Sequence, residues 1–256
     1  MLETYAQKYI DNGRLIFVQT PDARKFGEWL HRRILKQQWT PPDYFYHFNE
    51  GGHVAATRAH LPSKFFVRLD LAKFFDSISR GRVHRSLRRI GFKHGSAWDA
   101  ACQSTVSKDR PGYSLPFGFV QSPVLASLAL TTSALGAALL GLHNRAVRLS
   151  VYMDDFILSG DDFGELSDAR DSLAAAAEVS GFQFNPAKST GPSAALEVFN
   201  LNLCHGHLAV TATRLAAFEA ALTVASVQEA DGILGYVGTV NADQRSLLAA
   251  GRPPAT

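Results

Sequence analysis

The sequence has few of the features that mark secreted, disulfide-bonded or ATP-hydrolysing proteins. Its 256 residues include only two cysteines, Cys102 and Cys204, which lie far apart and without metal-ligand spacing. No Gly-x-x-x-x-Gly-Lys loop is present, which excludes a P-loop ATPase. The N-terminus has no basic segment followed by an apolar one, the pattern of a secretory signal. We therefore expect a protein of the reducing cytoplasm.

Positive charge is scarce in the second half of the chain. Residues 1–110 contain 19 Lys and Arg against 10 Asp and Glu, whereas residues 111–256 contain 7 against 13. Because basic surfaces attract phosphates, the N-terminal half is predicted to face nucleic acid. A hydrophobic content of 46% is enough for a substantial core, so we expect one unit with subdomains rather than several independent domains.

Charge is absent from residues 122–142. Ser122 and Pro123 have the form of a helix start, as N-cap and first helical residue, and predict one helix that runs to about Leu142. Its length approaches that of a membrane span, but Ser, Thr and Gly residues dilute its apolar character and no cluster of charges follows. We therefore expect a buried helix rich in small residues, and no membrane partner.

Residues 147–159, V-R-L-S-V-Y-M-D-D-F-I-L-S, have the pattern of two strands joined by a tight turn. Apolar residues alternate with others up to Met153, and Phe156 begins a second apolar run. Asp154 and Asp155 therefore fall at the tip of the predicted hairpin. Two-residue turns favour Asn-Gly or Asp-Gly, and neighbouring carboxylates repel each other, so a turn alone does not account for this pair. A solvated acidic loop is the alternative.

Asp70 lies in a further apolar segment, F-F-V-R-L-D-L over residues 65–71, that also predicts a strand. Three carboxylates at neighbouring strand ends would repel one another unless a cation neutralised them. Oxygen ligands without nearby His or Cys favour Mg²⁺, which commonly binds a few carboxylates together with substrate phosphates. Two such ions can activate a 3′-hydroxyl and stabilise a leaving pyrophosphate. The chemistry predicted is nucleotidyl transfer.

Five segments of the chain resemble motifs A to E of reverse transcriptases, in that order. They are D-L-A-K-F-F-D-S-I (residues 70–78), L-P-F-G-F-V-Q-S-P (115–123), Y-M-D-D (152–155), G-F-Q-F-N-P-A-K (181–188) and E-V-F-N-L-N-L (197–203). The finer pattern is more similar to the bacterial reverse transcriptases associated with phage defence and abortive infection than to retroviral or group II intron enzymes.

This resemblance implies an α+β fold: a right-hand polymerase with a ferredoxin-like palm, reduced fingers and a short helical thumb. The expected boundaries are residues 1–64 for the fingers, with part of 80–110, residues 65–203 for the palm, and residues 204–256 for the thumb and a disordered tail. The residues themselves predict strand, helix, hairpin, helix and strand, which is the order of a ferredoxin-like fold.

The resemblance also implies which residues hold the metal ions. Asp70 and Asp154 are expected to be the principal ligands of two Mg²⁺ ions, with Mn²⁺ as a substitute, and Asp155 is expected to support them. The backbone carbonyl of Leu71 is a further expected ligand. Lys188, in the segment similar to motif D, is expected to donate a proton to pyrophosphate; an ordinary surface lysine is an equal alternative.

Another set of residues is expected to bind the incoming nucleotide. Phe75, five residues after Asp70, stands where the family has the aromatic residue that excludes a ribose 2′-hydroxyl; a core aromatic beside Phe74 is the alternative. Phe117 replaces the Gln of many relatives, and Gly118 would let the backbone approach a nucleotide or base. The remaining candidates are Gln121, Tyr152, Arg58 and Arg68. Solvated surface charges are the alternative for the two arginines.

A basic helix is predicted after Ser79, a typical N-cap residue, and is expected to end at Gly91. No acidic residue interrupts residues 80–93, and like charges on one helix destabilise it, so an anionic partner explains the pattern better than a solvated surface. Phosphate contacts there would position nucleic acid without reading its sequence. The residues expected to make them are Arg82, Arg85, Arg88 and Arg89.

We expect RNA-directed DNA synthesis, in which dNTPs are joined on an RNA template into a DNA product, as part of anti-phage defence. Template-independent or protein-primed terminal nucleotidyl transfer is an alternative, because Phe117 removes a polar contact near the nascent base pair. A catalytically silent nucleic-acid-binding subunit is a second alternative, which the retained aspartates disfavour.

The segment after residue 203 is short and poor in positive charge. Its only Lys or Arg residues are Arg214, Arg245 and Arg252, against four acidic residues. Such a segment is a weak clamp for a nucleic-acid duplex. We therefore expect a dedicated structured noncoding RNA, a protein partner or self-association to complete the duplex-binding surface.

Overall fold

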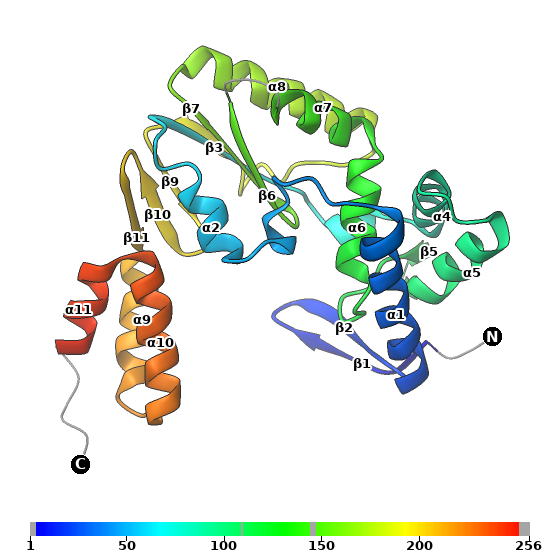
Figure 1. Ribbon diagram of the computed structural model, residues 1–256, viewed down its shortest axis with the longest axis horizontal. Helices are drawn as coiled ribbons and strands as arrows, with labels where there is room; N and C mark the ends of the chain where they lie inside the picture. Colours follow the sequence, from blue (N-terminus) through cyan, green and yellow to red (C-terminus); the bar gives the residue numbers. More distant parts are fainter. Residues whose placement is uncertain (1–3, 109, 144–146, 251–256) are drawn as a thin grey trace. The chain divides into compact units, whose positions relative to one another are not determined.

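The structure is a computed structural model that describes residues 4–108, 110–143 and 147–250 (Figure 1). The chain forms two compact units. The first unit contains Met1–Phe45, Asp70–Asn144 and Asp171–Asn185, and the second contains Tyr46–Leu69, Arg145–Arg170 and Pro186–Thr256. The tail expected to be disordered, residues 251–256, lies outside the described residues. The boundaries expected for fingers, palm and thumb stay predictions.

A four-stranded sheet with the order β6-β7-β3-β8 contains the predicted hairpin. The bounds are Arg148–Tyr152 for β6, Asp155–Gly160 for β7, Phe65–Asp70 for β3 and Thr190–Ser193 for β8. Strand, helices, hairpin, helix and strand follow one another along the chain, and the last strand, β8, pairs with the first, β3. This is the ferredoxin-like arrangement predicted from the sequence.

The hairpin strands β6 and β7 are buried along their middle residues, so both of their faces are covered. Two serines in these strands are tolerated because His60 bonds to both: its Nε2 lies 2.8 Å from Ser150 Oγ and its Nδ1 lies 2.7 Å from Ser159 Oγ. Ser159 Oγ also donates to Ser63 Oγ at 2.9 Å. We call His60, Ser63, Ser150 and Ser159 the His60 cluster.

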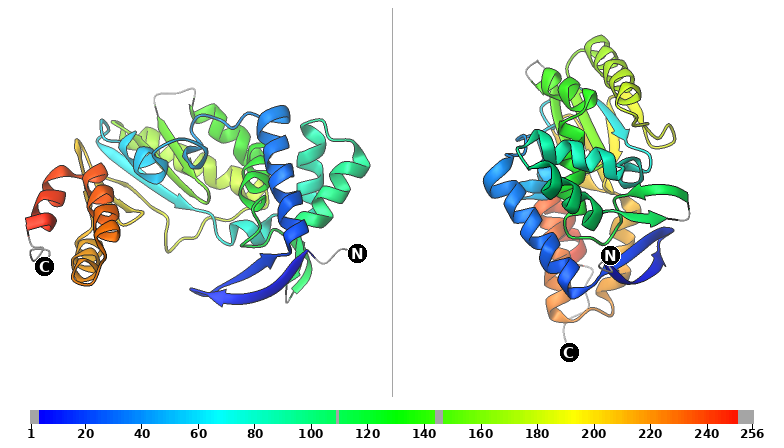
Figure 2. Two further views of the ribbon diagram at one scale, coloured as in Figure 1. Left: turned by 60° about the horizontal axis from the view of Figure 1, so that its bottom comes forward. Right: turned by 90° about the vertical axis from the view of Figure 1, so that its right-hand side faces the viewer.

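The second unit also contains a three-stranded sheet and the C-terminal helices (Figure 2). The strands, in the order β11-β10-β9, are β9 (Ala195–Val198), β10 (Leu201–Cys204) and β11 (His207–Val210). The helices are α2 (Gly52–Arg58), α9 (Ala212–Leu222), α10 (Val227–Val240) and α11 (Ala242–Ala250). Their apolar residues form one core, with Val54, Leu201, Phe218 and Val237 among its members.

The first unit begins with a β-hairpin. Strands β1 (Tyr5–Asp11) and β2 (Arg14–Gln19) are joined by Asn12 and Gly13, which both have positive φ as in a type I′ turn. Helix α1 (Pro21–Arg33) follows, and one π-helical turn (Ile34–Gln38) extends it. Thr20 is the N-cap of α1, since its Oγ1 accepts the N–H of Ala23 at 3.3 Å.

The remaining elements of the first unit follow this helix along the chain. They are α3 (Phe74–Ser77), α4 (Arg80–Arg89), α5 (His94–Ser104), β4 (Val106–Lys108), β5 (Arg110–Ser114), α6 (Ser122–Thr131) and α7 (Ala134–His143), while α8 (Phe163–Val179) passes from the second unit into the first. The helix predicted after Ser79 is confirmed as α4, because Ser79 Oγ accepts the N–H of Arg82 and Gly91 has φ +96° beyond its end. Helix α5 packs on α4 and lies beside α1 (Figure 2).

The single helix predicted over residues 122–142 is wrong: α6 and α7 are separate helices that meet at a bend of 77°. Ser133 causes the break. Its Oγ donates to the Leu130 carbonyl at 2.6 Å and accepts the N–H of Gly136 at 3.2 Å, so it caps the second helix. A Cβ at Gly136 would collide with backbone carbonyls at the end of α6. The N-cap of α6 is Gln121 rather than Ser122.

Helix α6 is almost entirely buried, as predicted. Among the helices of the described chain, none is by itself both long and apolar enough to cross a membrane, although α6 and α7 taken together would be.

Candidate functional site

The turn of the β6–β7 hairpin consists of Met153 and Asp154. Tyr152 and Asp155 pair across it, so Asp155 is the first residue of β7 and Asp154 stands in the loop itself. Met153 has φ +59°, at a position where two-residue turns usually have glycine. A non-glycine residue held in this region costs about 1–3 kcal/mol, which the surrounding structure must offset.

His47 holds this turn from one side. It lies in the short 3-10 helix Tyr46–Phe48, and its Nδ1 accepts the N–H of Met153 at 3.2 Å. Burial lowers the pKa of His47 to about 4, and a hydrogen bond with the Val151 backbone opposes this shift only in part. The imidazole is therefore neutral near pH 7 and able to accept. Sequence reasoning missed His47, because nothing local distinguishes it from the other histidines.

Arg68 holds the turn from the other side. Its Nη2 and Nε donate to the same carboxylate oxygen, Asp155 Oδ1, at 2.7 and 2.9 Å, and its Nη1 donates to the Glu197 carbonyl at 3.3 Å. The side chains of this ion pair are only 21% and 15% exposed. Arg68, predicted to bind the nucleotide, is therefore already paired with a predicted metal ligand, whose charge it balances.

Asp70 is the last residue of β3 and is buried. The N–H of Lys64 donates to the Gly160 carbonyl at 3.2 Å, so β3 and its neighbour β7 run antiparallel. The end of β3 and the start of β7 thus belong to one edge of the sheet. Leu71, whose carbonyl is a predicted ligand, is also buried.

The predicted metal ligands are all oxygen donors, which suits Mg²⁺. Within the described residues, no group of three or more His, Cys, Asp or Glu side chains is gathered closely enough to hold a metal ion by itself. An open set of carboxylates is nevertheless what Mg²⁺ uses in phosphoryl transfer, since waters and substrate phosphates complete its shell. The donor set therefore fits an ion that binds together with its substrate.

Phe75 and Phe117, predicted to contact the nucleotide, lie together in the first unit. Their ring centroids are 4.8 Å apart, and the guanidinium of Arg14 lies 5.2 Å from the Phe117 ring. Lys108 also approaches this ring, at 6.0 Å, while it forms an ion pair with Asp76. Phe75 is mostly buried and also contacts Phe74, so its role in sugar selection stays a prediction.

Two residues expected at the nucleotide, Gly118 and Gln121, have close contacts within the chain. Gly118 has φ +97°, and a Cβ there would collide with the Phe17 carbonyl. The absence of a side chain therefore lets the backbone at Gly118 pack closely against strand β2. Gln121 is fully buried; its Nε2 donates to Ser104 Oγ and its Oε1 accepts from Gln19 Nε2, both at 3.2 Å. These bonds satisfy a buried amide, and the role of Gln121 at the nucleotide stays a prediction.

Three basic residues of α4, namely Arg82, Arg88 and Arg89, contact carbonyls just beyond the ends of helices. Arg82 donates to the Ser180 carbonyl after α8 and stacks on Phe182 at 4.3 Å. Burial first, and then the charge of Arg85, lower the pKa of Arg82. Arg88 donates to the Phe92 carbonyl at 2.8 Å, and Arg89 donates to that of Thr132. Cations at helix C-termini stabilise them, so this basic run has an intramolecular use that its charge pattern did not reveal.

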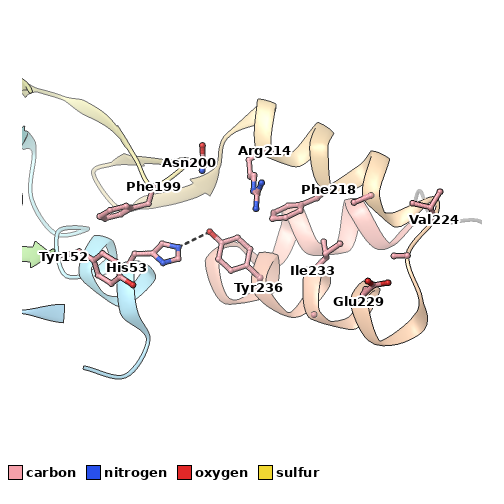
Figure 3. A pocket seen from close by; sticks show the side chains of 13 residues that line it. His53, Tyr152, Phe199, Asn200, Arg214, Phe218, Val224, Glu229, Ile233 and Tyr236 are labelled. Atoms are coloured by element: carbon pink, nitrogen blue, oxygen red, sulfur yellow. Dashed lines mark hydrogen bonds between the residues drawn. The ribbon is translucent and has the colours of Figure 1, made fainter. Parts of the chain in front are cut away.

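Three further predicted residues lie in the second unit. Arg58 donates to the Thr239 and Val240 carbonyls at the end of α10, another helix C-terminus. Lys188 is exposed, and its role stays a prediction. Tyr152 points into a cavity of about 850 Å³ that is shown in Figure 3.

This cavity lies between α2, the β9–β10 turn and helices α9 and α10. Aromatic rings line it: His53 Nε2 lies 3.2 Å from the Tyr236 hydroxyl, and Phe199 packs against Tyr152 with centroids 5.4 Å apart (Figure 3). The guanidinium of Arg214 lies 4.4 Å from the Phe218 ring. Flat apolar faces beside a cation suit a ligand that has both an aromatic and an anionic part.

Comparison with known proteins identifies relatives of this chain. The family model described as reverse transcriptase (RNA-dependent DNA polymerase) matches residues 7–203. A retron Mx65 reverse transcriptase of Myxococcus xanthus is 29% identical over 219 residues, which are 76% of this chain and 51% of that protein. The chain therefore spans about half the length of this curated relative.

Among solved structures, telomerase of Candida albicans in complex with a fragment of telomeric RNA has a TM-score of 0.52 at 12% identity, covering 89% of this chain and 46% of that one. A foamy viral protease-reverse transcriptase in complex with double-stranded DNA has a TM-score of 0.49 at 16% identity, covering 89% and 34%. At such identities the likeness to telomerase concerns the fold alone, and it confirms the predicted α+β polymerase class.

Proposed function

The chain belongs to the reverse transcriptase family, and we propose that it catalyses RNA-directed DNA synthesis at the β6–β7 turn. The observation that carries this proposal is the hairpin, which presents Asp154 in its loop and Asp155 at the head of β7, beside the strand that ends at Asp70. All three aspartates lie within the residues that the family model matches.

Asp70 and Asp154, with the carbonyl of Leu71, would hold two Mg²⁺ ions, or Mn²⁺ in their place. When bound, these ions activate the 3′-hydroxyl and stabilise the charge of the leaving pyrophosphate. Asp155 is balanced by Arg68, which reduces the repulsion that Asp154 would otherwise meet. This agrees with a supporting role for Asp155. Lys188 would supply a proton to the leaving pyrophosphate.

Phe75 would select deoxynucleotides through steric exclusion of the 2′-hydroxyl. Its contact with Phe117 restricts the ring, which a steric filter requires. Replacing Phe75 by Ala or Val should raise the ratio of ribonucleotide to deoxynucleotide incorporation, measured by competitive primer extension. An unchanged ratio would show that Phe75 is only a core residue.

The cavity of Figure 3 would receive the end of the primer strand. It begins at Tyr152, next to the catalytic turn, and extends along Phe199 to the thumb helices α9 and α10. The terminal base can stack on these rings, while Arg214 lies where a phosphate can be bound. Primer binding here would bring the 3′-hydroxyl to the turn.

The first proposed partner is an RNA template, for which a dedicated structured noncoding RNA is one candidate. The second is a protein partner or another copy of the chain. The similarity to a retron reverse transcriptase supports the first, and the weak positive charge after residue 203 supports the second. A role in anti-phage defence is part of the same proposal.

Primer extension on defined RNA templates tests the proposed function. Wild-type protein should add dNTPs complementary to each template, and the Asp154→Asn variant should not. Activity that needs no template would instead support terminal transfer, which the apolar Phe75–Phe117 contact favours as second candidate. Phage protection that survives replacement of both Asp154 and Asp155 by Asn would support the silent binding subunit.

A further inference from the structure

A cavity of about 560 Å³ lies in the first unit, and none of the residues predicted above for catalysis or nucleotide binding lines it. It is formed by α1, its π-helical extension, the α4–α5 connection and α5. Its lining includes Phe26, Trp29, Arg33, Gln38, Lys93, Asp99 and Gln103. Its volume falls within the roughly 300–1,000 Å³ that is typical of sites for small ligands.

One wall of this cavity is a stacking surface. Trp29 is 44% exposed although it is one of the largest apolar side chains, and it packs on Phe26 with centroids 5.6 Å apart. The guanidinium of Arg33 lies 5.4 Å from the ring of Trp29 and 5.4 Å from that of Phe92. An exposed indole beside a guanidinium is the surface on which unpaired nucleobases stack.

The cavity also has polar side chains that can form hydrogen bonds with the edge of a base. Gln38 and Gln103 each offer a donor and an acceptor. The carboxylate of Asp99 can accept from an exocyclic amine, but it disfavours a phosphate at the same place. A nucleotide would therefore place its base inside the cavity and its phosphate at the rim.

The rim has positive charge for this phosphate. Arg33 and Lys93 are exposed, and no carboxylate of the described residues forms an ion pair with either. By contrast, Arg24 on the same helix pairs with Glu28 at 3.0 Å. Uncompensated cations beside an aromatic wall favour nucleic acid over a neutral protein surface.

We propose that this cavity binds an unpaired nucleotide of a single-stranded nucleic acid. Its base stacks on Trp29, the edge of the base bonds to Gln38 and Gln103, and its phosphates contact Arg33 and Lys93. The proposal deepens the proposed function, on which it rests for nucleic acid as the partner. It adds a nucleic-acid contact on α1 and α5 to the one predicted on α4, where Arg82, Arg88 and Arg89 also bond to carbonyls beyond helix ends.

Fluorescence anisotropy of short labelled oligonucleotides tests this site, with nuclease-treated full-length protein that contains Asp154→Asn to prevent turnover. Trp29→Ala should weaken binding of single strands roughly tenfold, as expected for the loss of one base stack. The matched control is Trp98→Ala: Trp98 is 46% exposed and lies on α5 but outside the cavity, so its loss should change affinity less than about twofold. Trp29→Phe keeps a ring and should recover most of the affinity.

The charged rim has its own control. Arg33→Ala and Lys93→Ala should each reduce the slope of log affinity against log salt by about one, whereas Arg24→Ala should leave it unchanged. Affinity is measured for three probes: oligo-rA, oligo-dA and a blunt duplex. Tighter binding of oligo-rA or of oligo-dA identifies RNA or DNA as the single strand that the cavity binds.

Equal affinity of the Trp29→Ala and Trp98→Ala variants for single strands would overturn the proposal, and so would binding of the duplex alone. Because the readout is binding, a wild-type protein that binds single strands through Trp29 but extends no primer would sustain this site and refute the proposed function.

Discussion

The paired strands and the turn of the β6–β7 hairpin both contain polar side chains, and the structure stabilises them differently in the two regions. Along the strands, away from the turn, Ser150 and Ser159 are buried with His60, and neutral hydrogen bonds of 2.7–2.8 Å join all three. At the turn, the polar groups are the carboxylates of Asp154 and Asp155, and the preceding residue, Met153, has positive φ.

This difference indicates separate roles for the paired strands and for the turn. A neutral, fully bonded cluster fixes the position of strands and has no group left to react. The turn instead keeps charge and backbone strain, and it needs two outside residues, His47 and Arg68, to hold it. Strain and charge persist at functional sites because the surrounding structure offsets their cost.

The largest expected effect lies at the turn. Asp154→Asn keeps the size of the side chain and removes its charge, so it should lower the rate of dNTP incorporation by more than about a thousandfold. Thermal unfolding should change little. Ser150→Ala, in the paired strands, should show the opposite: a lower melting temperature with normal activity per folded molecule. Equal losses of activity in both variants would contradict the functional difference between the strands and the turn.

His60 should be the residue whose loss most affects stability. His60→Ala leaves two buried serine hydroxyls without this partner and opens a cavity, at a cost of about 3 kcal/mol in the free energy of unfolding. Chemical denaturation measures it. His207→Ala, which truncates an exposed histidine of β11, is the control and should stay near the wild-type value. A similar small effect in both variants would show that the His60 cluster does not organise the strands.

The same histidine predicts how stability depends on pH. Burial first, and then the charge of Arg148, lower the pKa of His60 to about 3. The unfolded chain therefore takes up a proton below pH 6.5 that the folded chain does not, so stability is full above pH 6.5 and falls from there toward pH 3. Its slope from this group is about 1.4 kcal/mol per pH unit. The His60→Ala variant should lose this contribution to the pH dependence, which chemical denaturation at several pH values measures.

A smaller effect is expected from His47, which acts on the turn without touching substrate. His47→Ala removes the acceptor for the Met153 N–H and should lower kcat by roughly 10–100-fold, as is typical when a supporting residue is lost. KM for dNTP should change little. His47→Asn offers an amide oxygen in place of Nδ1 and should recover part of the rate. If Asn and Ala behave alike, His47 only fills space.

The smallest effect is expected at Arg68. Arg68→Gln leaves Asp155 without its ion pair and should lower stability in EDTA by about 1–2 kcal/mol. Because Arg68 and a bound cation both balance this carboxylate, Mg²⁺ should raise the melting temperature of the variant more than that of wild type. An equal Mg²⁺ effect in both proteins would show that Asp155 does not take part in metal binding.

Elements that depend on neighbouring residues could be predicted from the sequence. Ser79 caps a helix where the pattern placed it, because an N-cap bonds within three residues. The β6–β7 hairpin and the succession of strands and helices around it also follow from local periodicity. The Asn12–Gly13 turn was present in the sequence as a hairpin signal, but its flanking strands alternate too weakly to be predicted.

Elements that depend on distant partners could not. The bend between α6 and α7 needs Ser133 to bond inward and Gly136 to pack on the end of α6, and the same residues would also suit a continuous helix. The basic run of α4 indicated an external anion, whereas Arg82 and Arg89 contact carbonyls 98 and 43 residues away in the chain. Charge counts do not show which partner a guanidinium meets.

By itself, the sequence determined the pattern from which nucleotidyl transfer is predicted: the three aspartates, their order and the strands that end or begin with them. Only the tertiary structure decided what holds them in place, since His47 and Arg68 lie 106 and 87 residues from their partners Met153 and Asp155. Carboxylates in a recognisable pattern are a local property of the chain. A hydrogen bond between segments so far apart depends on how every intervening element packs.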